Sequence, residues 1–88
     1  MEKYNGWKNR ASWNVALWLA NDEQLHFYTR TALQNYPTVH DSINAFIKFL
    51  DDAGIKKTPD GYNYNYQNMV EYFTNEFEEF NLVQYGDN

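Results

Sequence analysis

The segment from Ser12 to Asn21 constrains the fold most, because apolar residues occupy nearly every side of the helix that it predicts. One face carries them at the helical spacing i, i+3, i+4 and i+7, at Trp13, Ala16, Leu17 and Ala20. Much of the remaining surface is covered by Val15, Trp18 and Leu19. A helix that is apolar nearly all round is buried nearly all round. We therefore predict that this helix, with Ser12 as its N-cap, is the central element and is wrapped by the others.

Two further helices are predicted between residues 22 and 53. The residues Asn21-Asp22-Glu23 supply a cap and an acidic first turn, and the helix 22–35 stops before Pro37, because proline disfavours helical backbone in the residue before it. Its expected apolar face consists of Leu25, Tyr28, Ala32 and Tyr36. Thr38 can cap the next helix, which we expect to end at Ala53, followed by Gly54 in a left-handed turn.

The last third of the chain combines a loop with a long helix. The turn sequence T-P-D-G at residues 58–61 is followed by the segment 62–66, which we interpret as a loop leading into a helix capped by Asn65. The apolar stripe of that helix consists of Tyr66, Met69, Val70, Phe73, Phe77 and Phe80. Short connections favour antiparallel neighbours. The sequence therefore predicts an all-α fold, a compact bundle of about four helices around the buried first helix, in one domain over residues 1–88.

Charge is distributed unevenly along the chain, whose formal net charge is −5. Residues 1–57 carry seven basic and six acidic side chains, whereas residues 58–88 carry six acidic side chains and no Lys or Arg. We expect the acidic side of the last helix to be a solvated face. Direct nucleic-acid binding is not expected of an acidic protein, because neutralising phosphates requires clustered Lys and Arg.

Cysteine usage and hydropathy point to a cytoplasmic protein without a membrane segment. The chain has no cysteine, which excludes disulfides and thiolate metal sites, and small secreted domains usually depend on disulfides. The first six residues lack the apolar stretch of a signal peptide. The longest apolar run, residues 15–20, is far shorter than the about 20 residues that span a bilayer.

Candidate catalytic and metal sites match known patterns poorly. Glu23 and His26 have the E-x-x-H spacing of di-iron bundles, but such a site needs a second copy of the motif, which His40 does not provide. Counting back from Gly61 places no acidic ligand at the first or third position of a calcium-binding loop. No phosphate-binding glycine motif or nucleophile motif occurs. We therefore expect no enzymatic activity, no metal and no cofactor.

The N-terminal part of the chain carries a longer pattern. The run from Asn5 to Glu23, NGWKNRASWNVALWLANDE, holds three tryptophans and four asparagines at fixed spacing. It resembles small proteins of phages and bacterial mobile elements that open N-G-W-x-N-x-x-[ST]-W-N-V-[AS]-L-W-[LI]-x-N-D-E. Many of these also carry a T-P-D-G turn, here Thr58–Gly61. The resemblance implies a phage or mobile-element origin, and that family brings no established activity, catalytic residue or cofactor.

Protein–protein binding is the function that these features favour. Small acidic phage proteins often occupy a surface on a host or defence-system protein, such as a restriction enzyme or a CRISPR effector, and we predict an inhibitor of this type. Aromatic residues outside the helical stripes and carboxylates of the last helix are the predicted partner-binding residues: Trp7, Tyr62, Tyr64, Tyr66, Glu71, Glu76, Glu78 and Glu79. In this class, the helix 66–80 could present its carboxylates as a mimic of a phosphate backbone.

Two other function classes are open at this point. The first is a homo-oligomeric structural or accessory protein, such as a homodimer that buries Trp7 and the segment 62–66 between copies. A concentration-independent monomer would remove it. The second is a nucleic-acid-binding regulator that acts through Lys3, Lys8 and Arg10, and the absence of any salt-dependent shift of DNA or RNA would remove that class.

Overall fold

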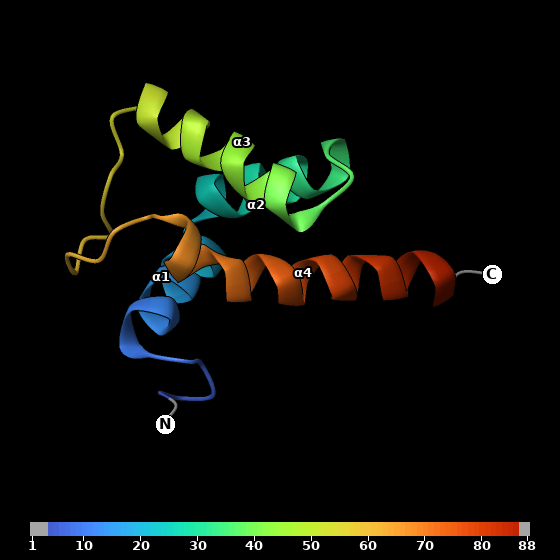
Figure 1. Cartoon of the computed structure of the whole chain (residues 1–88), viewed down its shortest axis with the longest axis horizontal. Coiled ribbons are helices and arrows are strands. Elements are labelled where there is room, and N and C mark those ends of the chain that lie inside the picture. Colours follow the sequence, from blue (N-terminus) through green and yellow to red (C-terminus); the bar gives the residue numbers. More distant parts are fainter. Residues whose placement is uncertain (1–3, 87–88) are drawn as a thin grey trace.

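The structure, a computed structural model, describes residues 4–86, with side chains through residue 79. Four helices form a bundle (Figure 1): α1 (Arg10–Asn21), α2 (Glu23–Asn35), α3 (Val39–Asp52) and α4 (Tyr66–Gly86). Extended pairing in the described residues is limited to isolated bridges. The prediction of an all-α bundle of four helices is confirmed. No helix within this part of the chain is both long and apolar enough to cross a membrane.

Two helices, α2 and α4, each pack against the other three, whereas α1 packs against α2 and α4. In Figure 1, α4 runs past the α2–α3 pair and its C-terminal end extends beyond the other helices. The largest fully buried side chains are Phe46, Phe73, Leu19, Ile43, Leu50 and Met69. The expectation that the other helices wrap α1 is therefore corrected, because α1 packs against two of them and not against α3.

Burial of α1 is confined to one side of the helix. Its buried residues are Ser12, Asn14, Val15, Ala16 and Leu19. On the other side Leu17 is 37% exposed, and Trp13 and Trp18 are half-buried. The prediction that α1 is buried nearly all round is wrong, because a domain of 88 residues has too few elements to cover every side of a helix. Two polar residues, Ser12 and Asn14, take inward positions instead.

Side-chain caps begin the four helices. Asn9, and not Ser12, caps α1: the Asn9 Oδ1 accepts the backbone N–H of Ser12 at 2.8 Å. Ser12 was predicted as the cap because the apolar run starts after it, but the helix begins earlier, at Arg10. The other caps lie where the sequence predicts them. Backbone N–H groups donate at 2.8–3.0 Å to the side chains of Asp22, Thr38 and Asn65.

Ser12→Ala is expected to stabilise the protein. The Ser12 hydroxyl is fully buried and has no hydrogen-bond partner among the described residues. An unpaired buried polar group costs roughly 1–3 kcal/mol, so its removal should raise the free energy of unfolding by about 1 kcal/mol and Tm by about 4–8 °C. Asn9→Ala should lower the free energy of unfolding by about 1 kcal/mol, because α1 loses its cap. Thermal unfolding of both variants checks the pair, and a destabilised Ser12→Ala protein would contradict the cap assignment.

A loop of residues 53–65 connects α3 to α4. Gly54 follows α3 with a φ of 76°, as predicted, and the N–H groups of Gly54 and Ile55 return to carbonyls of the last turn at 3.1 and 2.9 Å. This Schellman ending requires the positive φ that glycine adopts without strain. Further along, the N–H of Thr58 donates to the carbonyl of Tyr62 at 2.8 Å. The loop therefore doubles back on itself before α4 begins.

Candidate protein-binding site

A polar cluster joins α1 to the T-P-D-G turn, although 44 residues separate Asn14 from Thr58. The Thr58 hydroxyl donates to the Asn14 Oδ1 at 2.7 Å, and the Asn14 amide donates to the Asp60 carboxylate at 2.8 Å. The Trp18 Nε1–H donates to the same Asp60 oxygen at 3.0 Å. The hydrogen bonds from Asn14 and Trp18, followed by the charge of Arg10, hold the pKa of the Asp60 carboxyl below its usual range.

This cluster, which we call the Asn14 cluster (Asn14, Trp18, Thr58 and Asp60), connects the two motifs that the sequence resemblance rests on. Asn14 and Thr58 are 3% and 4% exposed, so their polar groups depend on these bonds for hydrogen-bond partners. The W-N-x-x-x-W part of the N-terminal run and the T-P-D-G turn therefore occur in one chain for a structural reason. Both hold the loop 53–65 against α1.

The N-terminal arm, residues 4–9, is shaped by an Asn-Gly turn. Asn5 and Gly6 have φ values of 49° and 87°, and Tyr4 and Trp7 exchange two backbone hydrogen bonds at 2.7 and 2.8 Å. This is the pattern of a type I′ turn, which favours asparagine followed by glycine because both central residues need positive φ. The turn directs the arm back toward α4, where Trp7 contacts Tyr72.

Two contacts attach the arm to α4. The Trp7 indole stacks on the ring of Tyr72, with 6.5 Å between ring centroids. The backbone N–H of Lys8 donates to the Glu71 carboxylate at 3.0 Å. These two contacts hold the arm against α4, so that Trp7 lies at the edge of the surface between α1 and α4.

An apolar pocket of about 190 Å³ lies where the arm, α1 and α4 meet. Its lining residues are Trp7, Trp13, Ala16, Leu17, Ala20, Asn21 and Tyr72. Ala16 and Ala20 are one helical turn apart on α1, and their small side chains leave the space open. The volume is below the roughly 300–1,000 Å³ of small-molecule sites, yet it is sufficient for one apolar side chain of a partner. We call this site the tryptophan pocket.

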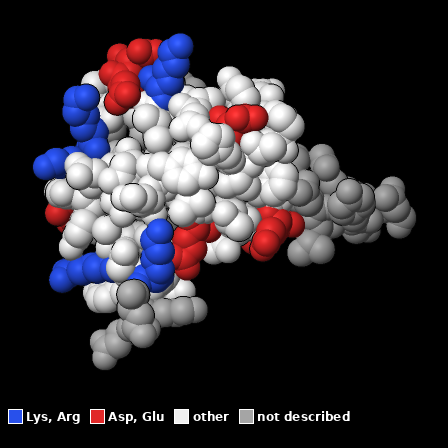
Figure 2. Space-filling view, in the orientation of Figure 1, with Lys and Arg blue, Asp and Glu red and all other residues white. Residues whose placement is uncertain are grey.

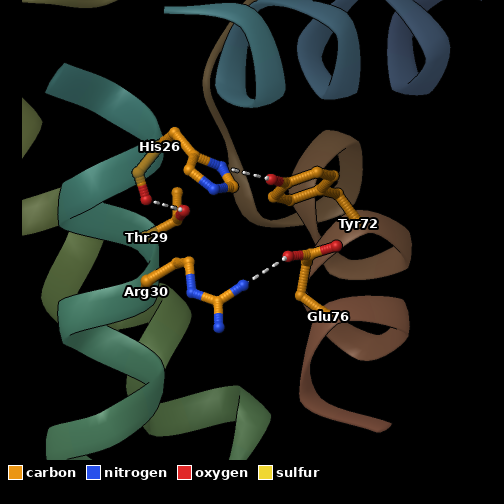
Figure 3. A network of polar contacts seen from close by, with 5 residues as sticks. All are labelled: His26, Thr29, Arg30, Tyr72 and Glu76. Atoms are coloured by element: carbon orange, nitrogen blue, oxygen red, sulfur yellow. Dashed lines mark hydrogen bonds and ion pairs between the residues drawn. The ribbon is translucent and has the colours of Figure 1, made fainter. Parts of the chain in front are cut away.

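Tyr72 also belongs to a polar network between α2 and α4 (Figure 3). The Tyr72 hydroxyl lies 3.4 Å from the His26 Nδ1, and the Arg30 Nη1 lies 3.8 Å from the Glu76 Oε1. The Thr29 hydroxyl donates to the backbone carbonyl of His26 at 2.7 Å. Burial, and then the Glu76 carboxylate, raise the pKa of Tyr72 to about 12. The phenol therefore stays protonated at neutral pH, and the network positions α4 against α2.

The predicted aromatic site residues occupy different environments. Trp7 is half-buried in the wall of the tryptophan pocket. Tyr64 is 7% exposed and belongs to the core, so its prediction as a surface residue is wrong. Burial raises the pKa of Tyr64 to about 12. Tyr62 and Tyr66 are half-buried, and the Tyr66 hydroxyl lies 3.3 Å from the His40 Nδ1. Trp7 lines the tryptophan pocket, whereas none of the residues 62–66 does.

The four predicted glutamates of α4 divide into two pairs. Glu71 and Glu76 are half-buried, and each contacts a partner, the first in the N-terminal arm and the second at Arg30. Glu78 and Glu79 are exposed. In Figure 2, the basic side chains lie toward the end of the molecule that carries the arm and the loop before α4, whereas acidic side chains lie both at that end and along α4. On the face shown, only acidic side chains therefore extend toward the far end of α4.

Sequence reasoning missed a second surface, on the outer side of α2. Phe27 is 64% exposed and Tyr36 is 43% exposed. Tyr36 was placed on the buried face, but it is the C-cap residue of α2 and has an extended backbone, so helical spacing does not apply to it. A groove of about 210 Å³ between α2 and α3 lies beside it and is lined by Tyr28, Thr31, Ala32, Asn35, Tyr36, Ala45, Phe46 and Phe49. One feature of the sequence could have indicated this surface. The helix α2 has only two charged residues, Glu23 and Arg30, which is few for a helix with a solvent-exposed side.

The candidate metal ligands of the sequence do not assemble into a site. Among residues 4–79, no group of three or more His, Asp or Glu side chains lies close enough together to hold a metal ion. His26 instead faces the Tyr72 hydroxyl, and His40 faces Tyr66 and the amide of Asn44, which is 3.0 Å from its Nε2. Both histidines therefore have structural contacts that account for their positions.

Comparison with known proteins places the chain in a family. The model of a family of unknown function, DUF7249, matches residues 1–82. No curated protein and no solved structure matches the chain. The matched range contains the arm, α1, α2, α3 and most of α4, and with them the Asn14 cluster and the tryptophan pocket. The protein belongs to the DUF7249 family, whose function is unknown.

Proposed function

We propose that this protein is a small effector of a phage or mobile element that acts in the host cytoplasm by binding, and thereby inhibiting, a host or defence-system protein. The tryptophan pocket is the observation that carries the proposal. Three aromatic rings, those of Trp7, Trp13 and Tyr72, surround a space the size of one side chain. Partner residues that insert into such pockets supply most of the binding energy of protein interfaces.

The acidic side of α4 favours a partner with a basic surface. Glu78 and Glu79 are exposed, and residues 58–88 contain no Lys or Arg that could neutralise them from within this segment. Arg30 of α2 faces Glu76, one turn earlier. Opposite charge across an interface speeds association and selects the partner. Basic surfaces are typical of proteins that bind nucleic acids, which supports a role for α4 as a mimic of a phosphate backbone.

Ala20→Arg should abolish partner binding without unfolding the protein. Ala20 lines the tryptophan pocket but is exposed, and arginine is a good helix former, so the longer side chain can fill the pocket from its rim. We expect a loss of affinity of about 100-fold, or roughly 2.7 kcal/mol. Ala53→Arg, at an exposed position at the end of α3, is the control with the same change in charge and should bind like the parent.

Affinity capture from the natural host, followed by mass spectrometry and titration of the captured protein, tests the proposal. The parent and Ala53→Arg should recover the same partner, and Ala20→Arg should not. Recovery of no protein above background by the parent would refute the proposed function. Capture by Ala20→Arg with unchanged affinity would place the contact outside the tryptophan pocket.

A further inference from the structure

We infer that the outer side of α2 is the interface of a symmetric homodimer, with a second copy of this chain as its occupant. The inference does not depend on the proposed function, which uses a different surface. Phe27 is 64% exposed, and its ring contacts that of Tyr28 edge-on at 5.5 Å. The Tyr28 ring in turn lies 4.2 Å from that of Phe49, beside the groove between α2 and α3. A row of aromatic rings therefore leads from solvent into that groove.

The surface is complementary to itself. Phe27 projects from the first half of α2, and the groove runs along the helix from Tyr28 to its far end at Asn35 and Tyr36, two turns after Phe27. In an antiparallel pair related by a two-fold axis, each Phe27 reaches the groove of the other copy, so one contact is made twice. The groove volume of about 210 Å³ exceeds the roughly 150 Å³ of a cavity known to accept a benzene ring.

Charge favours a second copy at this surface over other positions on the molecule. Two copies of a chain with net charge −5 repel each other where acidic groups meet, as they would along α4. The outer side of α2 has no net charge, because next to Phe27 it carries one exposed acid and one exposed base, Glu23 and Arg30, at i−4 and i+3. Its other residues near Phe27 are Gln24, Thr31 and Gln34. Arg30 also faces Glu76 of α4. On α3, the spacing from the groove residue Ala45 places the exposed Asp41, Lys48 and Asp52 on the side of the groove, which leaves less negative charge there than the four glutamates give α4.

The position of the two-fold axis follows from this arrangement. Thr31 lies midway in sequence between Phe27 and Asn35, and it lines the groove. When each Phe27 packs against Asn35 of the other copy, the two Thr31 side chains lie on either side of the axis. Thr31 is therefore the residue that should approach its own counterpart most closely.

Sedimentation of the full chain over a concentration series tests the dimer. The parent should change from monomer to dimer, and Phe27→Glu should remain a monomer with at least a 100-fold weaker self-association. Phe27 is mostly exposed, so this variant should keep the helical content of the parent. Gln67→Glu, at an exposed position of α4, adds the same charge elsewhere and should dimerise. A parent that stays monomeric up to about 1 mM, where even a contact of millimolar Kd is half formed, overturns the inference.

A cross-linking measurement locates the axis, and it is simple to read because the chain has no cysteine of its own. Two chains of Thr31→Cys should form a disulfide under mild oxidation, whereas Gln67→Cys chains should not. A dimer that survives Phe27→Glu, or that cross-links only through Gln67→Cys, overturns the assignment of the interface. If the parent is monomeric and Phe27→Glu loses capture of a host protein, the α2 surface belongs to that partner and the dimer is refuted. If Ala20→Arg no longer captures the partner but still dimerises, partner binding and dimerisation use separate surfaces.

Discussion

Asn14→Ala is expected to lower the free energy of unfolding by about 2–4 kcal/mol and Tm by roughly 10–25 °C. The truncation removes the acceptor of the Thr58 hydroxyl and one of the donors to Asp60, and it leaves a cavity in the buried side of α1. Since domains of this size are stable by only about 5–15 kcal/mol, the effect is a large fraction of the total. Thermal and urea unfolding of the purified variant provide the measurement.

Two companion variants isolate the contribution of the cluster. Asn63→Ala removes an exposed asparagine from the same loop and should change the stability by less than about 0.5 kcal/mol. Thr58→Val keeps the side-chain shape but removes the hydroxyl that donates to Asn14 and accepts the N–H of Tyr62, at a cost of about 1–3 kcal/mol. The double variant of Asn14 and Thr58 should cost less than the sum of the single ones, because they share a hydrogen bond. Additive effects would contradict the proposed coupling between α1 and the T-P-D-G turn.

Local signals explain why most of the secondary structure could be predicted. Caps such as Thr38 and Asn65 hydrogen-bond to the N–H three residues later, and Gly54 ends α3 within its own turn. Each of these interactions joins residues that are only a few positions apart, so it can be recognised from a short stretch of sequence. The error at Ser12 has the same origin, because an apolar run does not mark the start of a helix whose first turn is polar.

Long-range contacts explain what could not be predicted. The hydrogen bond between Asn14 and Thr58 helps to determine which side of α1 faces inward. These residues are 44 positions apart in the sequence, and neither carries a local signal that they pair. The same holds for Tyr64, whose alternation with polar residues is compatible with a surface loop until the loop folds against the core. Exposed Phe27 is the converse case. A single aromatic residue off the main helical stripe has no pattern that distinguishes an interface from an ordinary exposed side chain.

Phe73→Ala is expected to have the largest effect on stability, a loss of about 3–5 kcal/mol. Phe73 is fully buried in α4, and its ring lies 5.6 Å from that of Phe46 in α3. Because α4 contacts all three other helices, a cavity at this position weakens the packing of the whole bundle. Phe77→Ala, one turn later on the same helix at a half-buried position, is the matched control and should cost about 1–2 kcal/mol. Urea unfolding with a comparison of midpoints measures both.

The two variants also test whether the bundle core is centred on the buried face of α4 at Phe73. If Phe73→Ala costs no more than Phe77→Ala, that position of the core is contradicted. The outcome bears on function as well, since the neighbouring Tyr72 forms one wall of the tryptophan pocket. A loss of packing at Phe73 should therefore weaken partner binding together with stability, whereas Ala20→Arg should weaken binding alone. Comparing the two variants therefore distinguishes a loss of binding caused by destabilised packing from a loss caused by a side chain that fills the tryptophan pocket.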